Sequence, residues 1–211
     1  MNALIRNNIT FKNCYLFLIL DILLIVPVGI MTVIAPQFET HVEIISAIIS
    51  FILTLYIYMG YIKYSYIADE KKFRKIILIV IAILFGDFIF SLIETKTKFN
   101  SQMVFNYLSL MPLSYPLLFY GFKLIRNGKV DIFKRLSRLN LYLFVLIVFS
   151  SVTLLIATKS FTESIQWIIL LPFLLAVLII AILLIYWELK LFKYLSTKYD
   201  HLFIPKIEKL G

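Results

Sequence analysis

Asp87 is the side chain of this sequence best suited to chemistry, because it stands deep inside a long apolar run. Asp87, Ser91 and Glu94 are spaced at i, i+4 and i+7, which places them on one face of a helix. An acid at such depth in a membrane is costly and usually serves a function. A carboxyl group held away from water can keep its proton and act as a general acid. The spacing therefore predicts a polar stripe that faces protein or water.

A second group of polar residues follows in the stretch 106–116, which reads Asn-Tyr-Leu-Ser-Leu-Met-Pro-Leu-Ser-Tyr-Pro. Its two prolines remove backbone donors and bend the helix, which leaves carbonyl groups free to accept hydrogen bonds. A bent polar helix beside an acidic one would form the wall of a cavity within the membrane. The candidate catalytic residues are Asp87, Asp21 and Tyr115, and the candidate substrate-binding residues are Ser91, Glu94, Asn106 and Ser114.

The two acids have an alternative explanation. Asp21 stands in the first apolar run, where it could bind or activate water for the reaction. Asp21 and Asp87 could instead be hydrogen-bonded carboxyl groups that fasten helices together, a common use of polar groups inside membranes. The sequence does not decide between these roles.

The elements that carry these residues are predicted to be membrane helices. Hydrophobic residues make up 62% of the 211 residues, compared with roughly 45–50% in a soluble domain. A membrane span needs about 20 largely apolar residues. The stretches that qualify are 15–35, 44–62, 76–93, 103–124, 139–157 and 165–187. The sequence therefore predicts an all-α, polytopic helical bundle with about six transmembrane helices.

The distribution of basic residues predicts the orientation of this bundle. Of the 21 Lys and Arg residues, all but Lys96, Lys98 and Lys159 fall in the N-terminal arm, the second and fourth loops and the C-terminal tail. By the positive-inside rule, the N-terminus and the C-terminus are both cytoplasmic. This topology explains the net charge of +9. Nucleic acid is not expected as a partner, because the cations lie between apolar runs.

The predicted organisation is a single transmembrane helical domain over residues 1–187 and a basic amphipathic cytoplasmic tail over 188–211. The tail mixes apolar residues with lysines, which suits a helix lying along the anionic inner leaflet. A plain juxtamembrane end is the alternative. One cysteine and two distant histidines predict no metal site, and the absence of a nucleotide fingerprint predicts no cofactor.

The stretch 56–122 resembles the YhhN-type lysoplasmalogenase family of multi-pass membrane proteins. The resemblance consists of the basic loop Lys71-Lys-Phe-Arg-Lys75, the segment Leu84-Phe-Gly-Asp87, a short polar loop and the helix end Leu113-Ser-Tyr115. It implies hydrolysis of the vinyl ether bond of lysoplasmalogens within the membrane. Asp87 would be the family's acidic residue, and Tyr115 would stand in the place of its histidine. The chain lacks that histidine and the family's later Ser-Asp motif, and the family has about eight spans.

Two classes of function follow. The first is a lipid-handling membrane enzyme or an inactive relative of one. The alternative is a non-enzymatic protein, which would be a small transporter, a binding module, or a membrane-complex or sensor subunit coupled through its basic loops and tail. Membrane lipids are expected partners in both classes, and a membrane-protein partner or a homo-oligomer is expected in the second. The expected location is the cell membrane, such as a bacterial inner membrane.

Overall fold

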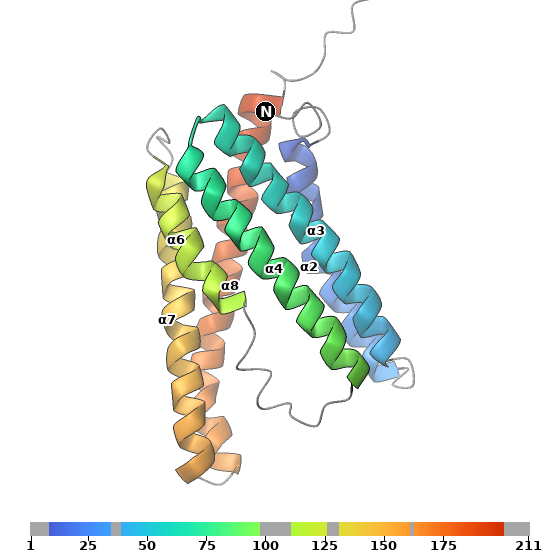
Figure 1. Cartoon of the computed structure of the whole chain (residues 1–211). Helices are drawn as coiled ribbons and strands as arrows, with labels where there is room; N and C mark the ends of the chain where they lie inside the picture. Colours follow the sequence, from blue (N-terminus) through green and yellow to red (C-terminus); the bar gives the residue numbers. More distant parts are fainter. Residues whose placement is uncertain (1–8, 35–38, 98–110, 126–130, 161–162, 201–211) are drawn as a thin grey trace, which may run out of the picture. The chain divides into compact units, whose positions relative to one another are not determined.

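The computed structural model of the chain describes residues 9–34, 39–97, 111–125, 131–160 and 163–200 (Figure 1). Within these ranges the structure contains helices and no strand, which confirms the predicted all-α class for this part of the chain. The helices are α2 (Phe11–Ile34), α3 (Glu39–Ile67), α4 (Lys71–Thr97), the short 3-10 helix η2 (Met111–Leu113), α6 (Ser114–Leu124), α7 (Asp131–Ser160) and α8 (Glu163–Tyr199).

Three helical segments of the described residues are long and apolar enough to cross a membrane: Ile44–Ile67, Asp131–Leu154 and Ile168–Tyr199. They belong to α3, α7 and α8, and they support the predicted membrane class. The count of six spans and the cytoplasmic location of the termini stay predictions. α6 and η2 lie in the predicted span 103–124, and Asn106 lies outside the described residues.

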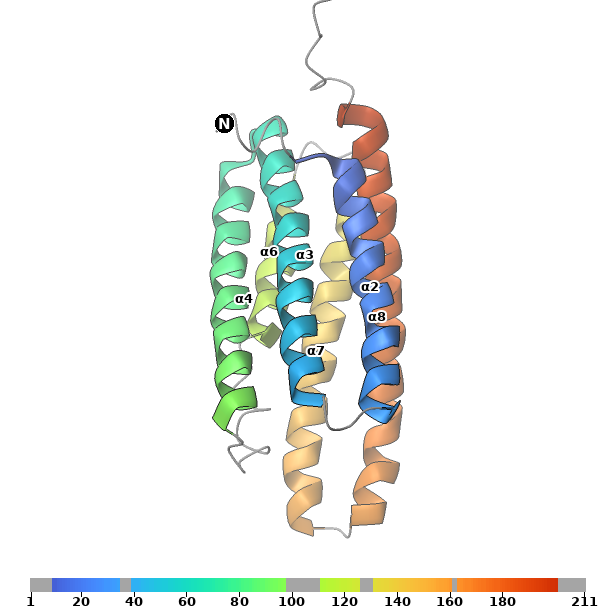
Figure 2. The same cartoon turned by 90° about the vertical axis from the view of Figure 1, so that its right-hand side faces the viewer.

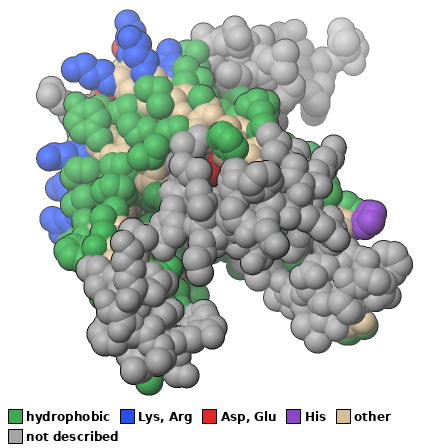
Figure 3. All heavy atoms as spheres, turned by 60° about the horizontal axis from the view of Figure 1, so that its bottom comes forward, with side chains coloured by type: hydrophobic (Ala, Val, Ile, Leu, Met, Phe, Trp, Pro, Cys, Tyr) green, Lys and Arg blue, Asp and Glu red, His purple; other side chains and the backbone are tan. Residues whose placement is uncertain are grey.

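The described surface is rich in apolar side chains. Leu171, Leu175, Leu178 and Ile182 of α8 are between 51% and 57% exposed. In Figure 3, hydrophobic side chains cover most of the described surface that faces the viewer, and Lys and Arg side chains lie along its margin. Such a surface would promote association in water, whereas in a bilayer it would contact lipid tails.

The chain forms two compact units. Unit 1 consists of Met1–Ile81 and Leu189–Gly211, and unit 2 of Ala82–Glu188. α4 and α8 each contribute to both units. The predicted tail begins at Glu188, within α8, which continues without a break to Tyr199. The division into one domain and a tail stays a prediction.

In unit 1, α2 and α3 pack side by side (Figures 1 and 2). A close approach occurs at Gly60, where a Cβ atom would lie 2.5 Å from the sulfur of Cys14 and 3.1 Å from Phe192. Phe192 belongs to the last part of α8, and it is fully buried together with Leu191 and Leu195. The apolar residues of the predicted tail therefore contact protein in this unit.

The turn between α3 and α4 is closed by a Schellman motif. The N–H groups of Glu70 and Asp69 donate to the carbonyl oxygens of Ser65 and Tyr66, at 2.9 and 3.4 Å. Asp69 has a φ of 53°, the left-handed conformation that this motif requires. Arg74 of α4 stacks over the ring of Tyr66 at 3.4 Å and donates to the hydroxyl of Ser65 at 3.2 Å. These contacts fix the beginning of α4 against the end of α3.

In unit 2, α6 and α7 pack against each other in opposite directions. The rings of Phe122 and Phe133 contact with their centroids 6.0 Å apart. Further from the connection between the helices, the hydroxyl of Ser137 donates to the carbonyl oxygen of Phe119 at 2.9 Å. These pairs define which residues of the two helices lie at the same level.

Candidate functional site

The phenol of Tyr115, the second residue of α6, is influenced chiefly by its burial and then by the charges of two carboxyl groups of unit 2. These belong to Glu188 of α8 and Asp87 of α4. All three side chains are half-buried. Charges interact more strongly in surroundings of low polarity than in water. We call Asp87, Tyr115 and Glu188 the Tyr115 group. It brings together two of the predicted candidates, Asp87 and Tyr115.

The beginning of α6 is determined by the prolines that the sequence places there. Pro112 lies in η2, and Pro116 lies in the first turn of α6, where a helix has no use for the missing N–H group. Ser114, a predicted substrate-binding residue, begins α6 and is 2% exposed. The prolines therefore suit a helix that begins at Ser114 and carries Tyr115 in its first turn.

Asp87 lies on a half-buried face of α4, together with Gly86 and Phe88. Phe85, Ile89 and Phe90 leave between 41% and 52% of their surface exposed, whereas Asp87 is half-buried. The more exposed face of the helix at this level is therefore apolar. Ser91 and Glu94 also lie in α4, but their side chains lie outside the described residues. The predicted polar stripe therefore stays a prediction beyond Asp87.

Glu188 is the member of the Tyr115 group that the sequence argument missed. It directly follows Trp187, which was expected to end the sixth span, and it was therefore assigned to the tail. In the structure, the guanidinium carbon of Arg135 lies 4.5 Å from the ring of Trp187. This contact holds the segment before Glu188 against α7. Its position one residue beyond an apolar run was the feature of the sequence that could have indicated it as a candidate.

Asp21, the third predicted catalytic residue, lies in unit 1. Its carboxylate accepts a hydrogen bond from the hydroxyl of Ser50 at 2.6 Å. This bond joins α2 to α3. The structure therefore pairs Asp21 with Ser50 of a neighbouring helix.

No known protein family matches this chain, and no curated protein or solved structure matches it either. The resemblance to the YhhN-type lysoplasmalogenases therefore rests on the residues quoted for it.

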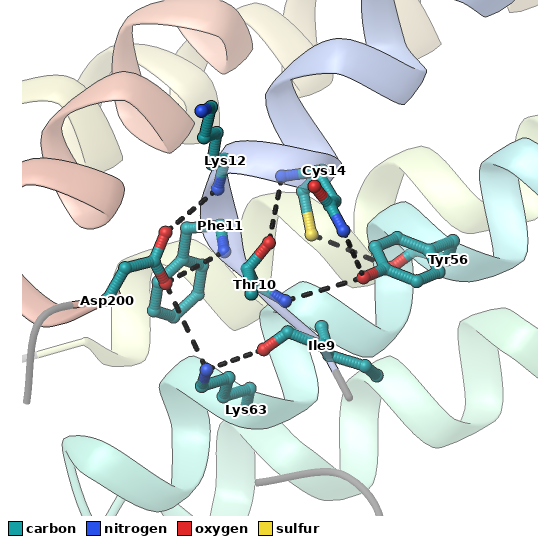
Figure 4. Close-up of polar contacts among 9 residues, drawn as sticks. Ile9, Thr10, Phe11, Lys12, Cys14, Tyr56, Lys63 and Asp200 are labelled. Carbon is teal, nitrogen blue, oxygen red and sulfur yellow. Dashed lines mark hydrogen bonds and ion pairs between the residues drawn. The ribbon is translucent and has the colours of Figure 1, made fainter. Parts of the chain in front are cut away.

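A second polar cluster surrounds the N-terminal end of α2 (Figure 4). The N–H groups of Phe11 and Lys12 both donate to the carboxylate of Asp200 at 3.0 Å. The N–H of Asn13 donates to the side-chain oxygen of Thr10 at 3.1 Å, and the N–H of Thr10 donates to the hydroxyl of Tyr56 at 3.4 Å. All four donors that a helix leaves unmatched at this end are thus satisfied. The negative charge of Asp200 also complements the helix dipole.

Lys63 of α3 completes this cluster from the other side. It is 1% exposed, and its ammonium group lies 4.0 Å from a carboxylate oxygen of Asp200. The same group donates to the carbonyl oxygen of Ile9 and lies 5.2 Å from the ring centre of Phe11 (Figure 4). A buried charge needs such partners, because it has lost its contact with water. The cluster therefore joins α2, α3 and the end of α8.

Cys14, one residue before the first predicted span, belongs to the same cluster. Its thiol is fully buried and donates to the carbonyl oxygen of Tyr56 at 3.8 Å. Burial raises the pKa of the Cys14 thiol to about 12, and the charge of Asp200 acts in the same direction. Because the thiolate is the reactive form, we expect this thiol to be inert in the folded protein. The polar contacts of this cluster therefore serve to hold the helices together.

Proposed function

We propose that the chain is a multi-pass membrane protein that handles lysolipids at the Tyr115 group. The observation that supports this is the placement of the Tyr115 phenol in the field of two carboxyl groups, those of Glu188 and Asp87. An acid at membrane depth, as predicted for Asp87, is expensive, and its electrostatic influence on the same phenol as Glu188 favours a functional use. The apolar surface around them suits a substrate that arrives through the lipid.

The reaction that this group suits best is acid-catalysed hydrolysis of a vinyl ether. The vinyl ether is protonated on the double-bond carbon that does not carry the oxygen. This gives an oxocarbenium ion, which water attacks. The resulting hemiacetal loses a proton and collapses into a long-chain aldehyde and the glycerol hydroxyl of the headgroup. One carboxyl group must donate the first proton and another must orient the water. In this proposal Asp87 is the acid, Glu188 orients the water, and Tyr115 hydrogen-bonds between them.

The orientation of the protein is also part of the proposal. In unit 1, the beginning of α2 and the end of α8 meet beside the turn between α3 and α4, and exposed lysines surround them: Lys12, Lys71, Lys72 and Lys198. The positive-inside rule assigns such an end to the cytoplasm. This convergence supports the expectation that both termini lie on the cytoplasmic side of the cell membrane.

The proposed reaction is tested by aldehyde release from a lysoplasmalogen added to the purified protein in detergent. We expect the wild type to release aldehyde and Asp87→Asn to release it at least about a hundredfold more slowly. The asparagine keeps the shape of the side chain but removes the carboxylic acid. Asp131→Asn, which alters an exposed acid at the start of α7, is the matched control. No release by the wild type, or equal release by Asp87→Asn, would overturn the proposed reaction.

The second candidate is a non-enzymatic membrane protein, and the Asp21–Ser50 hydrogen bond favours it. That bond uses an acid within an apolar run to join two helices. A binding module or transporter would use the Tyr115 group without turnover, and a subunit or sensor would bind a partner. Purification in mild detergent distinguishes these possibilities, because a subunit would copurify with a partner in fixed ratio.

A further inference from the structure

The exposed side of α7 changes from basic to apolar along the helix. Three cations come first, and all of them are exposed: Lys134, Arg135 and Arg138. An aromatic residue and four further apolar ones follow, each with between 40% and 60% of its surface exposed: Tyr142, Val145, Val148, Phe149 and Val152. Steps of three and four residues keep these side chains on one side of a helix. We call this side the open face of α7.

The other side of α7 is covered by α6. The ring of Phe133 contacts the ring of Phe122, and the hydroxyl of Ser137 donates to the carbonyl oxygen of Phe119. α7 also contains one of the segments long and apolar enough to cross a membrane, Asp131–Leu154. A helix that passes from phospholipid headgroups into hydrocarbon presents cations first, then an interfacial aromatic residue, then apolar side chains. The open face has this order, so we expect it to contact lipid along its length.

Arg135 lies at the basic end of the open face, with its guanidinium group over an aromatic ring. Its guanidinium carbon is 4.5 Å from the ring centroid of Trp187. Stacking uses the flat side of a guanidinium group, whereas its N–H donors point outward in the plane of the group. Within the residues that the structure describes, no carboxylate forms an ion pair with Arg135 or with Arg138, one turn further on. Residues three apart are neighbours on a helix, so both guanidinium groups can bind one phosphate.

The charges at this end favour an anionic headgroup over a zwitterionic one. Lys134 adds a third cation, and the acid that accompanies them is Asp131, which is exposed one turn before Arg135. Three cations against one acid leave an excess of positive charge. Phosphatidylcholine also offers a phosphate, but its ammonium group would meet these cations. Arg135 already lies over the ring of Trp187, where such an ammonium group could otherwise bind.

We infer that the open face of α7 binds an anionic phospholipid of the phosphatidylglycerol type. Its phosphate is held by Arg135 and Arg138, Tyr142 lies at the level of the glycerol backbone, and an acyl chain follows the apolar residues as far as Val152. The rise from Tyr142 to Val152 is about 15 Å, which matches half of a hydrocarbon core of about 30 Å. The inference goes beyond the proposed function, because this lipid is a ligand of the surface and is not a substrate.

The test compares two phospholipids that differ only in their headgroup. The full-length protein is purified in dodecyl maltoside, and its Tm is followed while dioleoyl phosphatidylglycerol or dioleoyl phosphatidylcholine is added. A ligand that binds only the folded protein raises its Tm. We expect phosphatidylcholine to need at least about a tenfold higher concentration than phosphatidylglycerol for the same shift.

The variants separate this site from the overall positive charge of the protein. Arg135→Gln combined with Arg138→Gln removes both guanidinium groups, so the difference between the two lipids is expected to fall below about threefold. The control combines Lys71→Gln with Lys72→Gln, which removes the same charge from exposed positions of α4 in unit 1. This control is expected to retain the preference of the wild type.

Three results would overturn the inference. Equal responses of the wild type to both lipids would leave the open face to bulk lipid or to a second copy of the chain. An unchanged preference in the arginine variant would place the binding elsewhere, and an equal loss in the lysine control would assign it to net charge. If the arginine variant does not fold, Lys134→Gln combined with Arg138→Gln takes its place, because this pair leaves the contact between Arg135 and Trp187 intact. Selective binding without aldehyde release would refute the proposed reaction and leave this site standing.

Discussion

The carboxylate of Asp200 lies 4.0 Å from the buried ammonium group of Lys63. The same carboxylate accepts both of the first two N–H groups of α2. One side chain therefore links the end of α8 to the beginning of α2 and to the last turns of α3. Aromatic contacts between Tyr199 and the rings of Phe11 and Tyr64 surround this link.

Replacing Asp200 by alanine is expected to destabilise the protein by about 2–4 kcal/mol. The change leaves two helix donors unmatched and removes the counter-charge of a buried lysine. Asp200→Asn keeps an acceptor without the charge, so it should lose less. The measurement is thermal unfolding in detergent, with Lys193→Ala, an exposed residue of the same helix, as the control. A Tm of Asp200→Ala equal to that of the control would contradict the prediction.

Replacing Gly60 by alanine is expected to destabilise the protein by about 1–3 kcal/mol, because the added methyl group would overlap the sulfur of Cys14. Removing that sulfur should relieve the overlap. The loss in Gly60→Ala should therefore be smaller in a Cys14→Ala background than in the wild type. Strictly additive effects of the two changes on the free energy of unfolding would show that the two positions are not in contact.

The thiol of Cys14 is expected to resist a methanethiosulfonate reagent in the folded protein and to react fully after unfolding. It is the single cysteine of the chain, so labelling reports this site alone. Its pKa is raised from 9.0 to about 12 by burial, so the folded protein holds the proton more tightly than the unfolded chain. The contribution of this group to stability is therefore full below pH 9.0 and is lost as the pH rises towards about 12. Rapid labelling of the folded protein at pH 8 would contradict this account.

The hydrogen bond between Asp21 and Ser50 is expected to contribute about 0.5–1.5 kcal/mol to the packing of α2 on α3. A double-mutant cycle with Asp21→Ala and Ser50→Ala measures this coupling from the free energies of unfolding. A coupling energy near zero would mean that each residue acts independently. In that case, the structural role of Asp21 would have to be abandoned.

The helical class could be predicted from the sequence because a bilayer admits few structures. In apolar runs such as those of α3, α7 and α8, every backbone group must be bonded within the helix. Asp87 and Tyr115 could be selected for a related reason, since polar groups inside such runs are costly. The helical class is confirmed for the described residues, whereas the roles of Asp87 and Tyr115 stay predictions.

The residues that the sequence argument missed depend on contacts between distant segments. Asp200 caps α2 from the other end of the chain, and no local pattern indicates that pairing. Glu188 stands just beyond the end of a predicted span, where an interfacial position explains a polar residue equally well. Thr10 is different, because a threonine directly before an apolar helix is a recognisable N-cap signal.

The cap that Asp200 provides has a consequence for the order of events during synthesis. The first two donors of α2 find their acceptor 189 and 188 residues further along the chain. While the ribosome is still producing the later helices, the N–H groups of Phe11 and Lys12 lack this acceptor, although Thr10 and residues of α3 already contact the beginning of α2. A nascent chain that stops before Asp200 would keep this end unsealed, which offers quality-control proteases a means of recognising incomplete copies.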